Sequence, residues 1–379
     1  MIHRYQKKGL NFVLDVNSGA VHLLDDISYA VSGLLDENMG DTCPQSIIDA
    51  LSDYTADEIR EAYDELYELK KAGQLFAQDD YIDVSRYIPV NAPVKALCLH
   101  VAHDCNLRCQ YCFASTGDFG QGRKIMPPDI AKKAIDFVIA RSGVRHNIEV
   151  DFFGGEPLMA WDTVTQTVDY ARSLEEKYNK KFRFTITTNG LLLDEDKRKY
   201  INENMDNCVL SLDGRREVND EFRKTVAGTG SYDTIVPKFK ALVDERDPNL
   251  DYYARGTFTS HNLDFAEDVL SIADAGFDRL SVEPVTADPG CGYDLTEDDL
   301  PKIEAEYDRL TDIMLERKKE GKPFTFFHFM VDLDQGPCVV KRLRGCGAGY
   351  EYVAVTPDGD IYPCHQFVGK DEFKQGSVL

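Results

Sequence analysis

The stretch Ala102–Ser115, AHDCNLRCQYCFAS, places Cys105, Cys109 and Cys112 within one short loop. It follows an apolar run, KALCLHV (95–101), that is typical of a buried strand. Zinc ribbons usually pair one CxxC with another, and no matching second pair stands in the sequence. Three thiolates from one loop can instead bind three irons of a [4Fe–4S] cube, which leaves the fourth iron free for another ligand. The stretch therefore predicts a ligand-binding iron–sulfur cluster, with a structural zinc site as the alternative.

From Val94 onward, strand-like apolar runs alternate with helix-like segments. Six such units predict an α/β fold with a parallel sheet, either a partial barrel or a doubly wound sheet. In both architectures functional groups gather at the carboxyl ends of the strands. The expected strands are 95–101, 147–153, 182–188, 207–213, 252–258 and 278–285, and the expected helices are 129–141, 161–178, 195–204, 232–245, 263–275 and 297–319.

Residues 1–85 form a separate unit in the sequence pattern. Two apolar-rich runs flank the turn signal Asn17-Ser18-Gly19, which indicates a hairpin. Helices are expected at Ile27–Leu35, Gln45–Leu51 and Thr55–Ala72, and the last opens with a capping box. A wing strand is expected in GQLFAQDDYI (73–82), which completes a winged-helix-like pattern.

The charge of the chain limits its partners. It carries 43 Lys and Arg against 66 Asp and Glu, a net charge of −23, and residues 1–90 carry 7 against 17. Such acidity disfavours nucleic acid and anionic lipid as partners. No run of about 18 apolar residues occurs, so we expect a cytoplasmic protein. The first unit is then expected to dock a peptide, by addition of a strand to its sheet edge, or to serve as a structural cap.

The βα rhythm ends after Lys322. The segments YVAVT and DIYPC flank the turn signal Pro357-Asp358-Gly359, which predicts a hairpin. Cys346 and Cys364 lie in the same glycine-rich region. The ten cysteines of the chain are too unevenly spaced for a disulfide framework. Residues 321–379 are therefore expected to be a small domain that bound metal stabilises.

The cysteine loop resembles that of the radical S-adenosylmethionine (SAM) enzymes, which share the pattern CxxxCxΦC with an aromatic at Φ, here Tyr111. The resemblance implies a radical SAM partial (β/α)6 barrel over residues 94–320. It also implies that Cys105, Cys109 and Cys112 hold a [4Fe–4S] cluster whose open iron binds the amino and carboxylate groups of SAM. In that family the reduced cluster cleaves SAM to a 5′-deoxyadenosyl radical, which abstracts hydrogen from the substrate.

The same resemblance implies a SAM pocket at the strand ends. The GGE segment receives the amino group, a serine lies at the ribose, an arginine binds the carboxylate, and the sixth strand contacts the adenine. Arg223 as an ordinary surface residue is the alternative. The expected cofactor-binding residues are Tyr111, Phe113, Gly154, Gly155, Glu156, Thr188, Asn189, Ser211, Arg223 and Val282.

The C-terminal pattern Cys346-x12-Gly359-x4-Cys364 resembles the opening of the SPASM domain, a carrier of auxiliary [4Fe–4S] clusters. Cys346 and Cys364 are the expected ligands of one such cluster. Cys338 is a candidate third ligand, with a packed or free thiol as the alternative. No cysteine follows Cys364, so the chain looks truncated and a second auxiliary cluster is in doubt.

Together, VLDVNSGAVH, the cysteine loop and the GCGAGYEY to YPCHQFVG region resemble the maturases of SCIFF peptides. That resemblance implies thioether formation in a cysteine-rich precursor peptide, whose leader the acidic first unit recognises, with a flavodoxin- or ferredoxin-type electron donor. The alternatives are formylglycine formation on a sulfatase, carbon–carbon crosslinking, or a binding protein with a structural metal. No general base is identified from the sequence.

Overall fold

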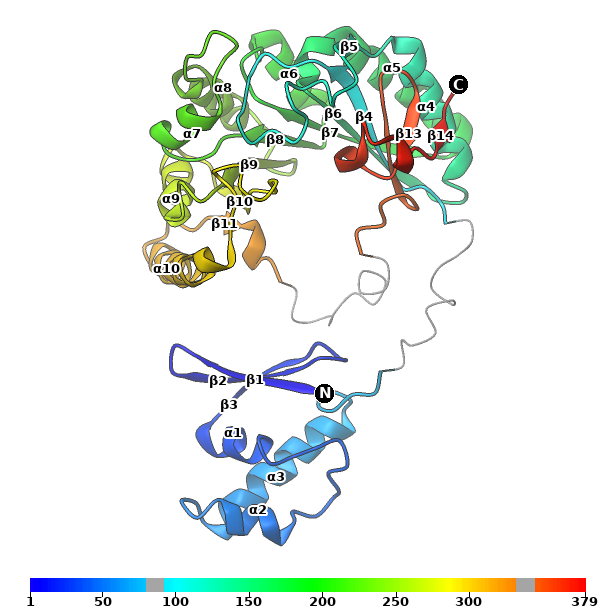
Figure 1. Ribbon diagram of the computed structural model, residues 1–379. Helices are drawn as coiled ribbons and strands as arrows, with labels where there is room; N and C mark the ends of the chain where they lie inside the picture. Colours follow the sequence, from blue (N-terminus) through cyan, green and yellow to red (C-terminus); the bar gives the residue numbers. More distant parts are fainter. Residues whose placement is uncertain (80–91, 332–344) are drawn as a thin grey trace. The chain divides into compact units, whose positions relative to one another are not determined.

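The computed structural model describes residues 1–79, 92–331 and 345–379 (Figure 1). The described residues divide into two compact units. Residues 1–79 lie in the first, together with Val331, Gly345 and Cys346, and residues 92–330 and 347–379 lie in the second. Each unit has its own hydrophobic core.

The first unit is a three-stranded antiparallel sheet against three helices. The sheet has the order β1 (Ile2–Lys7), β2 (Leu10–Asp15), β3 (Val21–Leu24), and the β2–β3 pair is the hairpin that the sequence predicts. Strand β1 was not predicted, because IHRYQK is mostly polar and exposed. No strand forms over residues 74–79, and the rest of the expected wing lies outside the described residues.

The three expected helices of this unit are α1 (Asp26–Ser32), α2 (Gln45–Ala50) and α3 (Ala56–Lys71). The capping box is present at α3, because Thr55 accepts from the backbone N–H of Glu58 and the Glu58 side chain accepts from that of Thr55. The apolar face of α3 is buried at Ile59, Tyr63 and Leu66.

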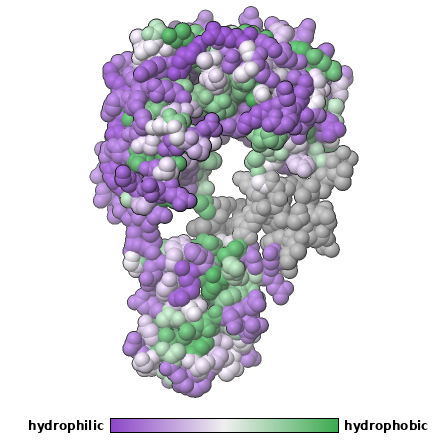
Figure 2. Space-filling model, in the orientation of Figure 1, coloured by the Kyte–Doolittle hydropathy of each residue, from purple (hydrophilic) through white to green (hydrophobic). Residues whose placement is uncertain are grey.

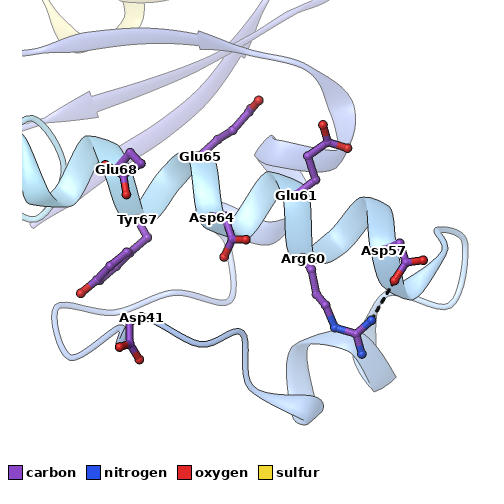
Figure 3. A pocket seen from close by; sticks show the side chains of 8 residues that line it. All are labelled: Asp41, Asp57, Arg60, Glu61, Asp64, Glu65, Tyr67 and Glu68. Carbon is purple, nitrogen blue, oxygen red and sulfur yellow. Dashed lines mark hydrogen bonds and ion pairs between the residues drawn. The ribbon is translucent and has the colours of Figure 1, made fainter.

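The polar side of α3 is acidic. Figure 3 shows Asp57, Glu61, Asp64, Glu65 and Glu68 projecting from the helix, with Arg60 as the single basic side chain among them. A DNA-reading helix needs a basic face to pair with phosphates. This face of α3 therefore offers no basic surface of the kind that a DNA-reading helix needs.

The sheet of the first unit has an apolar outer face. Tyr5, Phe12 and Leu23 stand side by side in register on the three strands, and Tyr5 and Phe12 stack with ring centroids 5.1 Å apart. Leu23 is 62% exposed, and Leu10 and Val21 are exposed on the same strands. Figure 2 shows hydrophobic surface on this unit.

The second unit confirms the predicted α/β fold with a parallel sheet. Its central strands pair in chain order, every pair parallel. Strands that follow one another without reversal place all their crossover helices on one face, and Figure 1 shows the helices outside the sheet. The strands are β4 (Ala96–His103), β6 (Asn147–Gly154), β7 (Lys181–Thr188), β8 (Asn207–Ser211), β9 (Asp251–Phe258) and β10 (Arg279–Pro284).

The helices of this unit match the predicted segments closely. The exception is α7 (Arg216–Phe222), a seven-residue helix in a polar stretch that gives no strong periodic signal. The other helices are α4 (Pro128–Arg141), α5 (Trp161–Tyr178), α6 (Glu195–Asn204), α8 (Tyr232–Asp244), α9 (Phe265–Asp274) and α10 (Leu300–Lys319).

Short strands extend the sheet at both ends. Strand β11 (Thr325–Phe326) pairs with β10, and β5 (Lys124–Ile125) pairs with β4. The predicted C-terminal hairpin is β12 (Tyr352–Val355) and β13 (Asp360–Tyr362), followed by β14 (Gly376–Ser377). Strand β12 also pairs with β4 in parallel, so the C-terminal segment continues the same sheet. Among the described residues, no helix is long and apolar enough to cross a membrane.

Candidate functional site

A cavity of about 510 Å³ lies in the second unit, and all six central strands contribute to its wall. The three cysteines of the loop after β4 line it. So do nine of the ten residues expected at a cofactor: Tyr111, Phe113, Gly154, Gly155, Glu156, Thr188, Asn189, Ser211 and Arg223. Residues that the sequence separates by more than a hundred positions therefore meet at one cavity.

The cysteine loop is anchored to the segment that follows α7. The backbone N–H of Arg108 donates to the carbonyl of Lys224 at 2.7 Å, and that of Gln110 donates to the carbonyl of Phe222 at 3.2 Å. The Arg108 guanidinium also donates to the carbonyl of Cys105 at 2.6 Å. These bonds hold the loop closed around the mouth of the cavity.

The three thiols of the loop are partly buried. Burial raises the pKa of Cys105 and of Cys109 to about 12 and also raises that of Cys112, so bound metal is needed to form the thiolates. Thiolates are the usual protein ligands of an iron–sulfur cluster.

Two glycines bring β6 against the cysteine loop. A Cβ on Gly154 would lie 2.2 Å from the carbonyl oxygen of Ala102, and one on Gly155 would lie 2.2 Å from that of Asp104. The Gly155 N–H donates to the Ala102 carbonyl at 2.7 Å, and the Glu156 N–H to the Asp104 carbonyl at 2.9 Å. The glycines are thus required by backbone contact with the loop.

The Glu156 carboxylate is buried and accepts three hydrogen bonds. It accepts from the Thr188 hydroxyl at 2.8 Å, from the Asn189 N–H at 2.8 Å and from the Leu158 N–H at 3.0 Å. Burial raises the pKa of Glu156 to about 7, although these bonds favour the ionised form. The side chain therefore ties β7 to the turn after β6.

Asn189 connects β7 to the cysteine loop. Its side-chain amide donates to the Asn106 side chain at 2.8 Å and lies 3.6 Å from Cys105 Sγ. Ser211, at the end of β8, is half-buried at the cavity wall. Both positions were predicted from their place at strand ends together with the family resemblance.

Arg223 is not an ordinary surface residue. It is 9% exposed, its Nη2 donates to Asp213 Oδ1 at 3.0 Å, and its Nε lies 2.9 Å from Asp213 Oδ2. The Tyr111 hydroxyl donates to the same carboxylate at 2.6 Å. A guanidinium has five donors, so Arg223 can pair with Asp213 and still donate to a ligand. Sequence analysis missed Asp213, although it ends the quoted strand 207–213.

Val282 is placed differently from the expectation. The Val282 side chain lies in the hydrophobic core, and the neighbouring Glu283, Pro284 and Val285 line the cavity instead. This correction follows from strand alternation, which sends Val282 and Glu283 to opposite faces. Cys346 is exposed and Cys364 is half-buried before a short turn. Cys338 lies outside the described residues.

Other cavity residues were not identified from the sequence. Arg255 on β9 and Glu283 on β10 bring opposite charges to the wall. His365, next to Cys364, is half-buried, and burial lowers its pKa to about 4. Strand register was the available signal for Arg255 and Glu283, whereas His365 lies in the quoted segment YPCHQFVG, in which no role was predicted for it.

Residues 99–253 match the model of the Radical SAM superfamily. An uncharacterized protein of Archaeoglobus fulgidus is 25% identical over 74% of this chain and 64% of its own length. A cysteine-type anaerobic sulfatase-maturating enzyme of Clostridium novyi is 26% identical over 73% of this chain and 74% of its own. The chain spans 64% and 57% of the first two curated relatives it matches.

Two solved structures share the fold. Native anSMEcpe with bound AdoMet aligns over 76% of this chain and 78% of its own, with a TM-score of 0.62 and 21% identity. SuiB of Streptococcus suis bound to the precursor peptide SuiA aligns over all of this chain and 85% of its own, with a TM-score of 0.57 and 17% identity. At these identities the likeness concerns the fold alone.

Proposed function

We propose that the chain is a radical SAM enzyme that oxidises residues of a peptide, because residues 99–253 match the model of that superfamily. The finer proposal is that it forms thioether bonds from cysteine sulfur to carbon in a cysteine-rich precursor peptide. The observation that carries the proposal is the single cavity in which the three cysteines meet the strand-end residues and Arg223.

The proposed roles of the cavity residues follow from their placement. Cys105, Cys109 and Cys112 would hold a [4Fe–4S] cluster, which with SAM supplies an oxidant that removes a hydrogen atom from substrate. Arg223, held in orientation by Asp213, would bind the carboxylate of SAM, since a guanidinium matches that group. The remaining volume, toward β9 and β10, would admit the substrate.

Peptide recognition is proposed for the first unit. Among the residues that the structure describes, strand β3 pairs with β2 alone, so its other edge is proposed to accept an extended peptide. Exposed Leu23 and Val21 on that strand offer apolar anchors. Relatives named as maturases, and a structural neighbour bound to a precursor peptide, support a peptide substrate. An auxiliary cluster at Cys346 and Cys364, and a flavodoxin- or ferredoxin-type donor, remain part of the proposal.

The experiment is anaerobic incubation of the reconstituted enzyme with SAM, dithionite and a SCIFF-type precursor peptide. We expect a loss of two hydrogens per crosslink by mass spectrometry, together with 5′-deoxyadenosine. The variant Cys105→Ala is expected to lose both products, while Cys43→Ala, in the first unit, keeps them. An unchanged peptide with the unaltered enzyme would contradict the proposed function.

Formylglycine formation and carbon–carbon crosslinking are the alternatives. Both use the same cavity chemistry but give products of different mass and fragmentation. A peptide-binding surface on the first unit favours a leader-bearing substrate over a sulfatase. A product that keeps its free thiols would favour carbon–carbon crosslinking.

A further inference from the structure

A chain of three polar side chains starts at the cavity wall. Glu283, at the end of β10, accepts from the Ser281 hydroxyl at 2.5 Å and lies 2.9 Å from Nε2 of His328. On the far side of the ring, Nδ1 of His328 lies 2.8 Å from the Tyr307 hydroxyl of α10. No motif of the sequence contains these residues, and the roles proposed above do not use them.

The hydrogen bonds assign the histidine tautomer. An ionised carboxylate only accepts, so Nε2 of His328 carries the proton toward Glu283. In the neutral ring Nδ1 is then the acceptor, and the Tyr307 hydroxyl donates to it. His328 is thus held on both sides, and Glu283 is held in orientation through it.

The surroundings keep Glu283 ionised. Burial opposes ionisation, but the bonds from Ser281 and His328 and the charge of Arg255 outweigh it and hold the pKa of Glu283 below its usual value. The groups facing Glu283 are Ser281 of its own strand, Arg255 of β9, and His328 after β11, with Tyr307 of α10 behind the imidazole. Glu283 therefore presents a proton-free carboxylate to the cavity at neutral pH.

The other carboxylates at the cavity differ from Glu283 in their hydrogen bonds or in their charge. Glu156 already accepts from three donors. Desolvation raises the pKa of Asp151 to about 6, so Asp151 is ionised less completely than Glu283 near neutral pH. Glu283 is the remaining carboxylate among the described residues that line the cavity.

We infer that Glu283 is the catalytic base of the oxidation, with His328 and Tyr307 as positioning residues; this rests on the proposed function. In thioether formation one C–H and one S–H bond break and one C–S bond forms. The hydrogen atom goes to the oxidant derived from SAM, the thiol proton goes to Glu283, and the remaining electron goes to an iron–sulfur cluster. The thiol loses its proton together with an electron, so a carboxylate is basic enough to accept that proton.

The variant Glu283→Gln keeps the shape of the side chain and removes its basicity. With a peptide deuterated at the acceptor carbon, we expect deuterium still to reach 5′-deoxyadenosine while product formation falls at least about 100-fold. Glu149→Gln, on β6 away from the cavity, is the matched control and is expected to match the unaltered enzyme. Product at the unaltered rate, or loss of deuterium transfer together with product, would overturn the assignment.

The positioning roles have a separate readout. In a plot of the rate of product formation against pH, the rate should fall at low pH because Glu283 takes up a proton. His328→Leu should move this acid limb to higher pH, because the Glu283 carboxylate loses a hydrogen-bond donor. His328→Gln restores an N–H and should return the limb toward its original position, whereas Tyr307→Phe should shift it less than His328→Leu. An acid limb that is the same in all variants would overturn these roles.

A measurement without cofactors tests the pair directly. In the full chain free of cluster, the nuclear magnetic resonance signal of the His328 Nε2 proton should move in Glu283→Gln, because the carboxylate that accepts from it is lost. An unchanged signal would overturn the contact. Failure of the unaltered enzyme to change the peptide would instead overturn the proposed function, whereas unaffected product formation by Glu283→Gln would overturn the base assignment alone.

Discussion

At the scale of single residues, the pair of Asp213 and Arg223 is central to the cavity. Both side chains are buried, and Asp213 also accepts from Tyr111 and from the backbone N–H of Thr257. One carboxylate thereby connects the cysteine loop, the segment after α7 and β9. Removing its charge leaves a buried guanidinium without its counter-ion.

We predict that Asp213→Asn lowers the free energy of unfolding by about 3–5 kcal/mol, because breaking one side of a buried ion pair strands the other charge. Urea denaturation of the cluster-free protein measures the change. Asp233→Asn removes an exposed partner of Arg216 and is the control, with an expected loss below about 1 kcal/mol. Equal losses in the two variants would contradict the prediction.

A second prediction concerns Asp151, whose pKa burial raises to about 6 from a usual value near 3.8. The folded state then binds a proton that the unfolded state releases, so stability falls as pH rises from about 4 to about 6. Asp151→Asn removes this cost, and its stability gain should be near zero at pH 4 and reach about 3 kcal/mol at pH 8. Unfolding at the two pH values measures it, and a gain independent of pH would refute the mechanism.

The sequence identified the cavity residues that end strands, because an apolar run followed by Gly, Ser, Thr or Asn is visible locally. Asp213 and Glu283 were missed in their roles, since their importance depends on partners on other strands or helices. The assignment of Val282 was displaced by one residue, and in a strand one residue changes the face.

At the scale of elements, the approach of β6 to the cysteine loop depends on glycine. We predict that Gly155→Ala lowers the iron content after reconstitution severalfold, because the added Cβ would lie 2.2 Å from the Asp104 carbonyl and displace the loop. Iron and sulfide assays per chain measure the effect. Gly40→Ala, where a Cβ meets nothing within 4 Å, is the control and should keep its iron.

The outer face of β3 gives a prediction for peptide binding. Leu23→Asp places a charge on the proposed apolar anchor and should weaken binding of the precursor peptide about tenfold, a cost of about 1.4 kcal/mol. Leu34→Asp, exposed after α1 and outside the sheet, should leave the affinity unchanged. Fluorescence anisotropy with a labelled leader measures both, and equal weakening would exclude β3 as the docking edge.

Most elements were predictable because strand and helix periodicities are local properties of the sequence. The pairing of β12 with β4 could not be predicted, because it joins Tyr352–Val355 to residues near Ala96, and no local sequence pattern indicates such a pairing. The same is true of β1, whose polar sequence forms a strand only because β2 offers it a partner. Tertiary pairing, rather than propensity, determines these elements.

At the scale of the whole molecule, two separate cores predict two separate unfolding transitions. Tyr63→Ala should lower the midpoint of the first unit alone, because Tyr63 is buried in its core. Ala354→Pro should lower that of the second unit alone, because it interrupts β12 between β4 and β13. Differential scanning calorimetry measures both, and a single transition that both variants shift would contradict independence.

The pairing of β4 with β12 has a consequence for biosynthesis. The Lys95 side chain binds Glu351 just before that pairing, across 256 positions of sequence. On the ribosome, the flank of β4 at residues 96–99 stays uncovered until residues 352–355 have emerged. An uncovered strand is a template for association with other chains. Nascent polypeptides of this protein are therefore expected to depend on chaperones until β12 is made and can pair with β4.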